Sequence, residues 1–101
     1  MILTDKAKKQ FNIFVIKEGL GNLHFRNIYD VIGLKAIPFS MQWGVYLEFA
    51  DSLGYDLSIF KDGCTNKWNV YFDNDYVNNK SITRKEAQLE ALNQLNIVLN
   101  I

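Results

Sequence analysis

The broadest apolar face in the chain lies in residues 40–54, and it predicts a central helix. At about 100° per residue, the apolar side chains of this stretch fall on one wide arc and leave only a narrow polar strip. Ser40 can cap the first turn, because its hydroxyl can accept from backbone N–H groups that lack helical partners, and Gly54 can take the left-handed conformation that ends a helix. A helix this apolar must be covered on most sides, so we expect it to be the hub of the fold, with Trp43 and Phe49 largely buried. The arc is formed by Gln42, Val45, Tyr46, Phe49, Ala50 and Leu53, extended by Trp43 and Leu47.

Helical periodicity also appears on both sides of this stretch. Residues 5–18 and residues 25–32 each place apolar side chains three and four positions apart, and a glycine follows each segment. Near the C-terminus, Thr83 and Glu86 form a capping box, in which each side chain serves the backbone of the other, and a helix is predicted from there to about Asn100. The apolar faces of the first and last of these helices consist of Ala7, Phe11, Phe14 and Val15, and of Ala87, Ala91, Leu92, Leu95, Val98 and Leu99.

After the central helix the period of the apolar positions changes from 3.6 to 2, which is typical of strands. Apolar residues alternate with others at residues 55–59 and again at residues 68–72, and Asp62-Gly63 stands in the turn between them. Residues 73–75 open a second loop, and residues 76–77 predict a short third strand. The pattern therefore indicates an antiparallel hairpin or three-stranded sheet with one buried face.

Pattern and composition together predict one α+β domain over residues 1–101: N-terminal helices, a central amphipathic helix, an antiparallel β-hairpin or three-stranded sheet, and a C-terminal helix. We expect the sheet to cover one side of the central helix. The chain is 49% hydrophobic and 14% aromatic, which suits a packed core and argues against disorder. No apolar run is long enough for a membrane span, and the single cysteine, Cys64, cannot form an internal disulfide. A soluble cytoplasmic protein is therefore expected.

The net charge is zero, but the charges are unevenly distributed along the chain. Residues 1–39 carry six basic and three acidic side chains, and residues 80–101 carry three basic and two acidic ones. Residues 40–79, in contrast, carry two lysines against six acidic residues. The central block thus predicts an acidic face for partner binding. Its acidic residues are Glu48, Asp51, Asp56, Asp62, Asp73 and Asp75.

The chain contains no residue set that specifies a reaction. Cys64 and the single histidine, His24, have no third group to orient them as nucleophile and base. Asp73 and Asp75 resemble the start of a calcium loop, but the glycine and the final glutamate of such a loop are missing. Gly19-Leu20-Gly21 follows no strand and lacks the third glycine of a dinucleotide-binding loop. We therefore expect no catalytic residues, no metal site and no cofactor.

The order helix, strands, helix over residues 40–100 resembles a double-stranded-RNA-binding domain. Thr83-Arg84-Lys85-Glu86-Ala87 is similar to the basic start of the last helix in that domain, so Lys80, Arg84 and Lys85 are candidate nucleic-acid-binding residues. The acidic residues of the hairpin would repel RNA, however. An RNA-binding module is therefore the alternative reading.

A second resemblance covers most of the chain. Ser-Met-Gln-Trp-Gly-Val-Tyr-Leu-Glu-Phe-Ala-Asp-Ser-Leu-Gly at residues 40–54, a strand that carries a tryptophan, Thr-Arg-Lys-Glu-Ala at residues 83–87 and Leu-Thr-Asp-Lys-Ala-Lys at residues 3–8 are similar to small proteins of phages and prophages of Bacteroidota. These motifs specify a fold rather than a chemistry, and they assign no functional residue.

The second resemblance implies a non-enzymatic protein that binds a host machine, such as an anti-CRISPR inhibitor of host defence. Its partner would be a host protein, either a CRISPR effector or another nucleic-acid-binding complex, in the host cytoplasm. The acidic central block suits this reading, because clustered carboxylates can imitate the phosphates that a basic channel binds. A structural or assembly role, with a homodimer, is the third reading.

Overall fold

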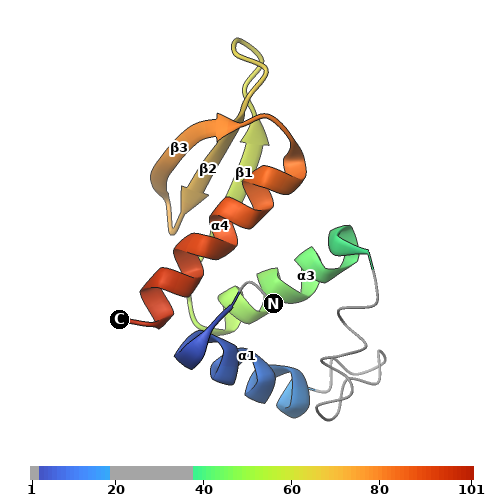
Figure 1. The fold of residues 1–101 in the computed structure, drawn as a ribbon, viewed down its shortest axis with the longest axis vertical. Coiled ribbons are helices and arrows are strands. Elements are labelled where there is room, and N and C mark those ends of the chain that lie inside the picture. Colours follow the sequence, from blue (N-terminus) through green and yellow to red (C-terminus); the bar gives the residue numbers. More distant parts are fainter. Residues whose placement is uncertain (1–2, 19–37) are drawn as a thin grey trace.

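The computed structural model describes residues 3–18 and 38–101, and they form an α+β fold (Figure 1). Two N-terminal helices precede a three-stranded antiparallel sheet, and a C-terminal helix packs on that sheet. The helix predicted over residues 25–32 lies outside the described residues. The elements are α1 (Asp5–Glu18), α3 (Phe39–Ser52), β1 (Leu57–Lys61), β2 (Trp68–Phe72), β3 (Asp75–Ser81) and α4 (Arg84–Leu99).

The sheet has the order β1-β2-β3, and its two connections differ in character. Between β2 and β3, Asp73 and Asn74 both have positive φ (51° and 71°), as in the tight turn whose twist matches the right-handed twist of paired strands. Between β1 and β2 the loop is longer, and Asn66 (φ 59°), rather than the glycine of Asp62-Gly63, takes the left-handed conformation. The backbone of Asp62 closes this loop by donating to the Lys67 carbonyl at 2.8 Å.

The third strand, β3, is longer than the two residues predicted, and it is irregular. Tyr71 of β2 pairs with Tyr76, Val70 pairs with Asn78, and Trp68 pairs with Ser81, so the pairing shifts twice along β3. Such bulges increase the local twist of an edge strand and blunt it as a template for further pairing.

Helix α3 begins earlier than the sequence pattern predicted. Pro38 occupies the N-cap position, no side chain caps the first turn, and Ser40 lies inside the helix. The Pro38 carbonyl accepts from the backbone of Met41 (2.9 Å) and of Gln42 (3.1 Å), so the first turn closes on proline. The predicted Ser40 cap is therefore wrong.

The predicted end of α3 is confirmed. Gly54 has φ +84°, its N–H donates to the Asp51 carbonyl at 3.0 Å, and the N–H of Tyr55 donates to the Ala50 carbonyl at 3.0 Å. These two bonds satisfy carbonyls that the helix itself leaves without partners, and they depend on the left-handed glycine.

The hub of the fold is α4 rather than α3. In Figure 1, α4 runs diagonally across the sheet, and α4 is in contact with every other described element. The sheet therefore covers α4, and the prediction that it covers one side of α3 is wrong. A physical reason is the short link Ile82-Thr83, which returns the chain from β3 onto the sheet at once. The apolar face of α3 instead packs against the aromatic side chains Phe11 and Phe14 of α1 and against α4.

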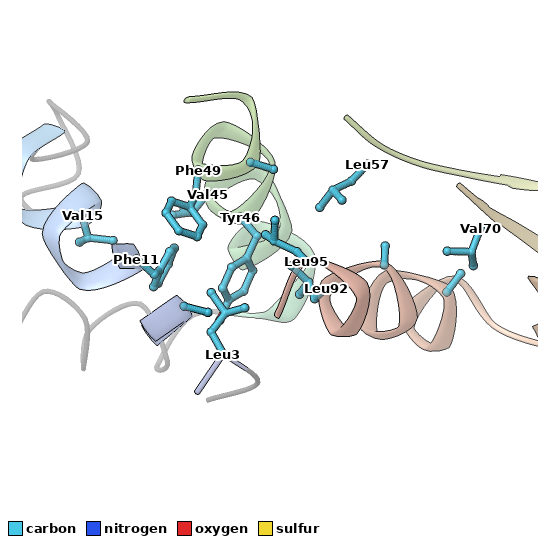
Figure 2. Packing of buried hydrophobic residues seen from close by; sticks show 14 residues of the cluster. Leu3, Phe11, Val15, Val45, Tyr46, Phe49, Leu57, Val70, Leu92 and Leu95 are labelled. Carbon is cyan, nitrogen blue, oxygen red and sulfur yellow. The ribbon is translucent and has the colours of Figure 1, made fainter. Parts of the chain in front are cut away.

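The hydrophobic core is one continuous cluster that extends from α1 to the sheet (Figure 2). Where α1 meets α3, the ring of Phe11 stacks on Tyr46 (centroids 4.9 Å apart) and meets Phe49 edge-on (5.2 Å). Phe49 is 1% exposed, as predicted, whereas Trp43 is only partly buried. The largest fully buried side chains are Phe11, Phe49, Leu3, Leu92, Leu95, Val15 and Val70.

Both ends of α4 are held by side chains. At its start, Thr83 Oγ1 accepts from the Glu86 N–H at 3.1 Å, which confirms one half of the capping box. In the other half, the Glu86 carboxylate accepts from the N–H of Ile82 (3.5 Å), not from that of Thr83. At its end, Asn96 accepts from the N–H of Thr4 (2.8 Å) and Asn100 accepts from the N–H of Ala7 (3.2 Å). Side chains of Asn96 in α4 and of Asn100 just after it thus cap the first turn of α1.

Because Tyr46 is buried, we expect the stability of the protein to decrease at alkaline pH. Desolvation raises the pKa of its phenol above the ordinary value of about 10. The unfolded chain therefore loses this proton first, and the free energy of unfolding should fall as the pH rises above about 10, by up to about 1.4 kcal/mol per pH unit. Urea unfolding at about pH 8 and about pH 11 measures this loss. In Tyr46→Phe the loss should be smaller, and an equal loss in both proteins would contradict the assignment.

Candidate interaction surfaces

Three of the six predicted acidic residues, Asp56, Asp73 and Asp75, lie at one end of the sheet, and two more, Glu48 and Asp51, lie in the last turns of α3, which leads into β1. Asp56 precedes β1, and its carbonyl accepts from the N–H of Asp73 at 2.6 Å, so these two residues extend the β1–β2 pairing. All five side chains are exposed. We call this group the acidic end; it consists of Glu48, Asp51, Asp56, Asp73 and Asp75.

Asp62, the sixth predicted residue, is separated from the others. It lies in the β1–β2 loop, beyond the far end of a five-residue strand that spans about 17 Å. One of its carboxylate oxygens, Oδ1, accepts from the N–H of Cys64 at 2.8 Å, so it also holds the loop in shape. The structure therefore does not bring Asp62 to the acidic end.

Positive charge gathers at the opposite end of the sheet. The Arg84 guanidinium lies 5.2 Å from the ring centroid of Trp68, and the Lys85 ammonium lies 5.7 Å from that of Phe39. Both cations are therefore engaged with aromatic rings of the protein itself. Together with two lysines that flank the loop, the predicted nucleic-acid-binding residues form what we call the basic end: Lys61, Lys67, Lys80, Arg84 and Lys85.

The face of the sheet that points away from α4 was not anticipated as a site. Its centre is a row of three aromatic rings, one from each strand. Phe60 stacks on Tyr71 (5.2 Å, planes 18° apart), and Tyr71 meets Tyr76 edge-on (5.4 Å). Phe60 remains 49% exposed and Tyr76 56% exposed. We call this surface the outer face; its residues are Ser58, Phe60, Asn69, Tyr71, Tyr76 and Asn79.

Polar side chains complete the outer face at both ends of the aromatic row. The side chain of Asn79 donates to the side-chain amide oxygen of Asn69 at 2.6 Å and accepts from the Thr65 hydroxyl at 3.3 Å. At the other end, the Ser58 hydroxyl donates to Asp56 at 3.4 Å. A sequence signal did exist for this face, because Phe60, Tyr71 and Tyr76 occupy positions that alternation assigns to solvent.

The orientation of the rings decides what the outer face can bind. Phe60 and Tyr71 have centroids 5.2 Å apart and planes 18° apart, which is an offset-stacked pair. Each ring therefore turns one of its two faces toward the other ring. This leaves at most one face of each ring for stacking on a nucleotide base, and half-exposed aromatic side chains favour contact with protein.

The candidates for chemistry that the sequence offered were a thiol, an imidazole and a metal-binding cluster. Cys64 is exposed in the β1–β2 loop, and His24 lies outside the described residues. Within residues 3–18 and 38–101, no group of three or more His, Cys, Asp or Glu side chains is arranged to hold a metal ion. A groove of about 370 Å³ between α1 and α3 is lined mainly by apolar and amide side chains, with Lys17 as its charged group.

Comparison of the chain with protein-family models, with curated proteins and with solved structures found no match. Among the described residues, no helix combines the length and the apolar character needed to cross a membrane. Proposals on function therefore rest on the surfaces described above and on the sequence resemblances.

Proposed function

We propose that this chain is a non-enzymatic, phage-type binding protein that inhibits a host defence or nucleic-acid-handling complex by occupying its basic nucleic-acid-binding surface. The observation that carries this proposal is the acidic end, where the fold places five exposed carboxylates on neighbouring segments. Carboxylates spread over such a surface can stand in for backbone phosphates and steer the chain toward a basic channel.

A protein partner fits this surface better than a nucleic acid does. Exposed carboxylates repel phosphates, and the two cations at the start of α4 already lie over Trp68 and Phe39. The fold also separates acidic from basic residues along the sheet, so a basic partner can meet the acidic end without meeting the lysines.

The proposal is tested by capturing partners from the native host with the full chain as bait and identifying them by mass spectrometry. The expected partner is a nucleic-acid-binding protein whose capture weakens as salt rises and is competed by its own nucleic acid. The double variant Glu48→Gln/Asp51→Asn should weaken this binding at least about tenfold, because it removes two charges of the acidic end.

Asp62→Asn is the matched control, since it removes one carboxylate at the opposite end and keeps the side-chain oxygen that accepts from Cys64. It should leave the affinity unchanged. Equal losses in the two variants would contradict a role for the acidic end, as would a partner that does not bind nucleic acid.

An RNA-binding module is the second candidate, and the basic end supports it. Five exposed cations lie around the β1–β2 loop and the start of α4. Direct titration with duplex and single-stranded RNA distinguishes the two proposals. Micromolar RNA binding that is lost in Arg84→Glu would favour this second candidate over the inhibitor, because neutralised phosphates determine such an affinity.

A further inference from the structure

We propose that the outer face of the sheet is a self-association surface, on which a second copy of this chain docks with its strands running in the opposite direction. The aromatic row of Phe60, Tyr71 and Tyr76 lies at the centre of this face, and two of its rings are about half exposed. Half-exposed aromatic side chains beside polar ones are typical of the centre of a protein interface.

The charges at the margins of the outer face identify the occupant. Asp56 and Asp73 lie at one end; Asp56 is bonded to Ser58 of this face, and its carbonyl pairs with Asp73. Lys67 lies at the other end, two residues before Asn69, and Lys80 lies in the bulge opposite Asn69. The face thus carries two negative charges at one end and two positive charges at the other, where Asp62, whose backbone bonds to that of Lys67, adds one negative charge.

Symmetry turns this charge pattern into a docking geometry. Two copies of one chain associate most often about a two-fold axis, so the shared surface must be complementary to itself. If the axis runs along the strands, aspartates meet aspartates and lysines meet lysines. If it runs across the strands, Asp56 and Asp73 of each copy meet Lys67 and Lys80 of the other, and the aromatic rows meet in the middle. The second arrangement satisfies both ends at once.

A nucleic acid fits the same face less well, because the aspartates repel phosphates at one end and the stacked pair of Phe60 and Tyr71 leaves at most one face of each ring for a base. The area of the outer face determines how strongly we expect two copies to associate. Three strands about 4.8 Å apart and about 17 Å long cover far less than the roughly 800 Å² per partner of a standard stable interface. The dimer is therefore reversible and depends on concentration.

The test is sedimentation velocity of the full chain from about 10 μM to about 1 mM, which spans the affinities expected of a small interface. The sedimentation coefficient should rise toward that of a dimer. Phe60→Ala/Tyr76→Ala should weaken association at least about tenfold. Ile97→Ala is the matched control, because Ile97 is also 49% exposed but lies on α4, and it should leave association unchanged.

Charge variants test the geometry. Lys67→Glu/Lys80→Glu makes both ends of the face acidic, and Asp56→Lys/Asp73→Asn makes both ends basic; asparagine suits the left-handed conformation at residue 73. Each variant alone should remain monomeric, and an equimolar mixture should form a heterodimer. Circular dichroism establishes that both are folded.

Three results would overturn the proposal: a wild-type chain that stays monomeric over the whole concentration range, association that persists in the ring variant, or charge variants that fail to associate when mixed. A monomeric wild type that binds a uridine decamer, and loses this binding in Lys67→Glu/Lys80→Glu, would instead assign the face to single-stranded RNA. The test uses no host partner, so its outcome is independent of the proposed inhibition.

Discussion

Replacing Phe49 by alanine is expected to lower the free energy of unfolding by about 3–5 kcal/mol. Phe49 is 1% exposed, and its ring lies against Phe11 (5.2 Å) and Phe14 (5.4 Å) of α1. Truncation therefore removes a large apolar side chain from a site whose walls come from two helices and cannot fully collapse. For a domain whose total stability is about 5–15 kcal/mol, the loss is severe, and urea unfolding followed by circular dichroism measures it.

Phe60→Ala is the matched control for this loss, because it removes the same side chain from a site that is 49% exposed. Its cost should be about 1 kcal/mol, mainly from the lost stacking on Tyr71. The two variants are compared at low protein concentration, so that self-association does not contribute. Similar losses for both would show that the α1–α3 contact is not a main source of stability.

Replacing Leu92 by alanine is expected to lower the free energy of unfolding by about 2–5 kcal/mol. It should destabilise the α1–α3 helix pair and the sheet together. Leu92 is fully buried on α4 and belongs, with Leu95 and with Tyr46 of α3, to one core cluster (Figure 2). Because α4 is in contact with the sheet as well as with α1 and α3, a cavity beneath it should weaken all of these contacts.

The two tryptophans allow this coupling to be measured, since Trp43 lies in α3 and Trp68 lies in β2. In a Trp68→Phe background the fluorescence of Trp43 reports on α3, and in a Trp43→Phe background the fluorescence of Trp68 reports on the sheet. Leu92→Ala should lower the urea midpoint equally in both backgrounds. Ile97→Ala, at a half-exposed position of the same helix, should lower it much less. A urea midpoint that falls in one background alone would show that the α1–α3 helix pair and the sheet unfold separately.

The elements of this protein could largely be predicted from local patterns. The bounds of α1, β2 and α4 and the left-handed Gly54 were predicted correctly, whereas β1 lies two residues later than the alternation at residues 55–59 predicted and β3 is longer than the two residues predicted. The start of α3 was not predicted correctly, because Ser40 has a suitable hydroxyl but Pro38, two residues earlier, already closes the first turn through its carbonyl. Ser40 and Pro38 were both possible first residues for this helix, and the sequence pattern did not show which of them starts it.

The candidate surfaces were only partly predictable. Charge counting found the acidic block, but it included Asp62, which a strand carries to the opposite end of the sheet. The aromatic row was missed because Phe60, Tyr71 and Tyr76 are far apart in the chain, and only strand pairing brings their rings within 5.2 to 5.4 Å. The register that aligns them is a property of the whole sheet.

What the sequence by itself determined is therefore the set of elements and their ends, since periodicity, caps and turns depend on residues only a few positions apart. The choice of α4 as the hub was decided by tertiary structure. Both α3 and α4 carry a wide apolar face, and periodicity does not say which of them the sheet will cover. The capping of α1 by Asn96 and Asn100 was decided in the same way, because it joins groups more than ninety residues apart once the fold has brought them together.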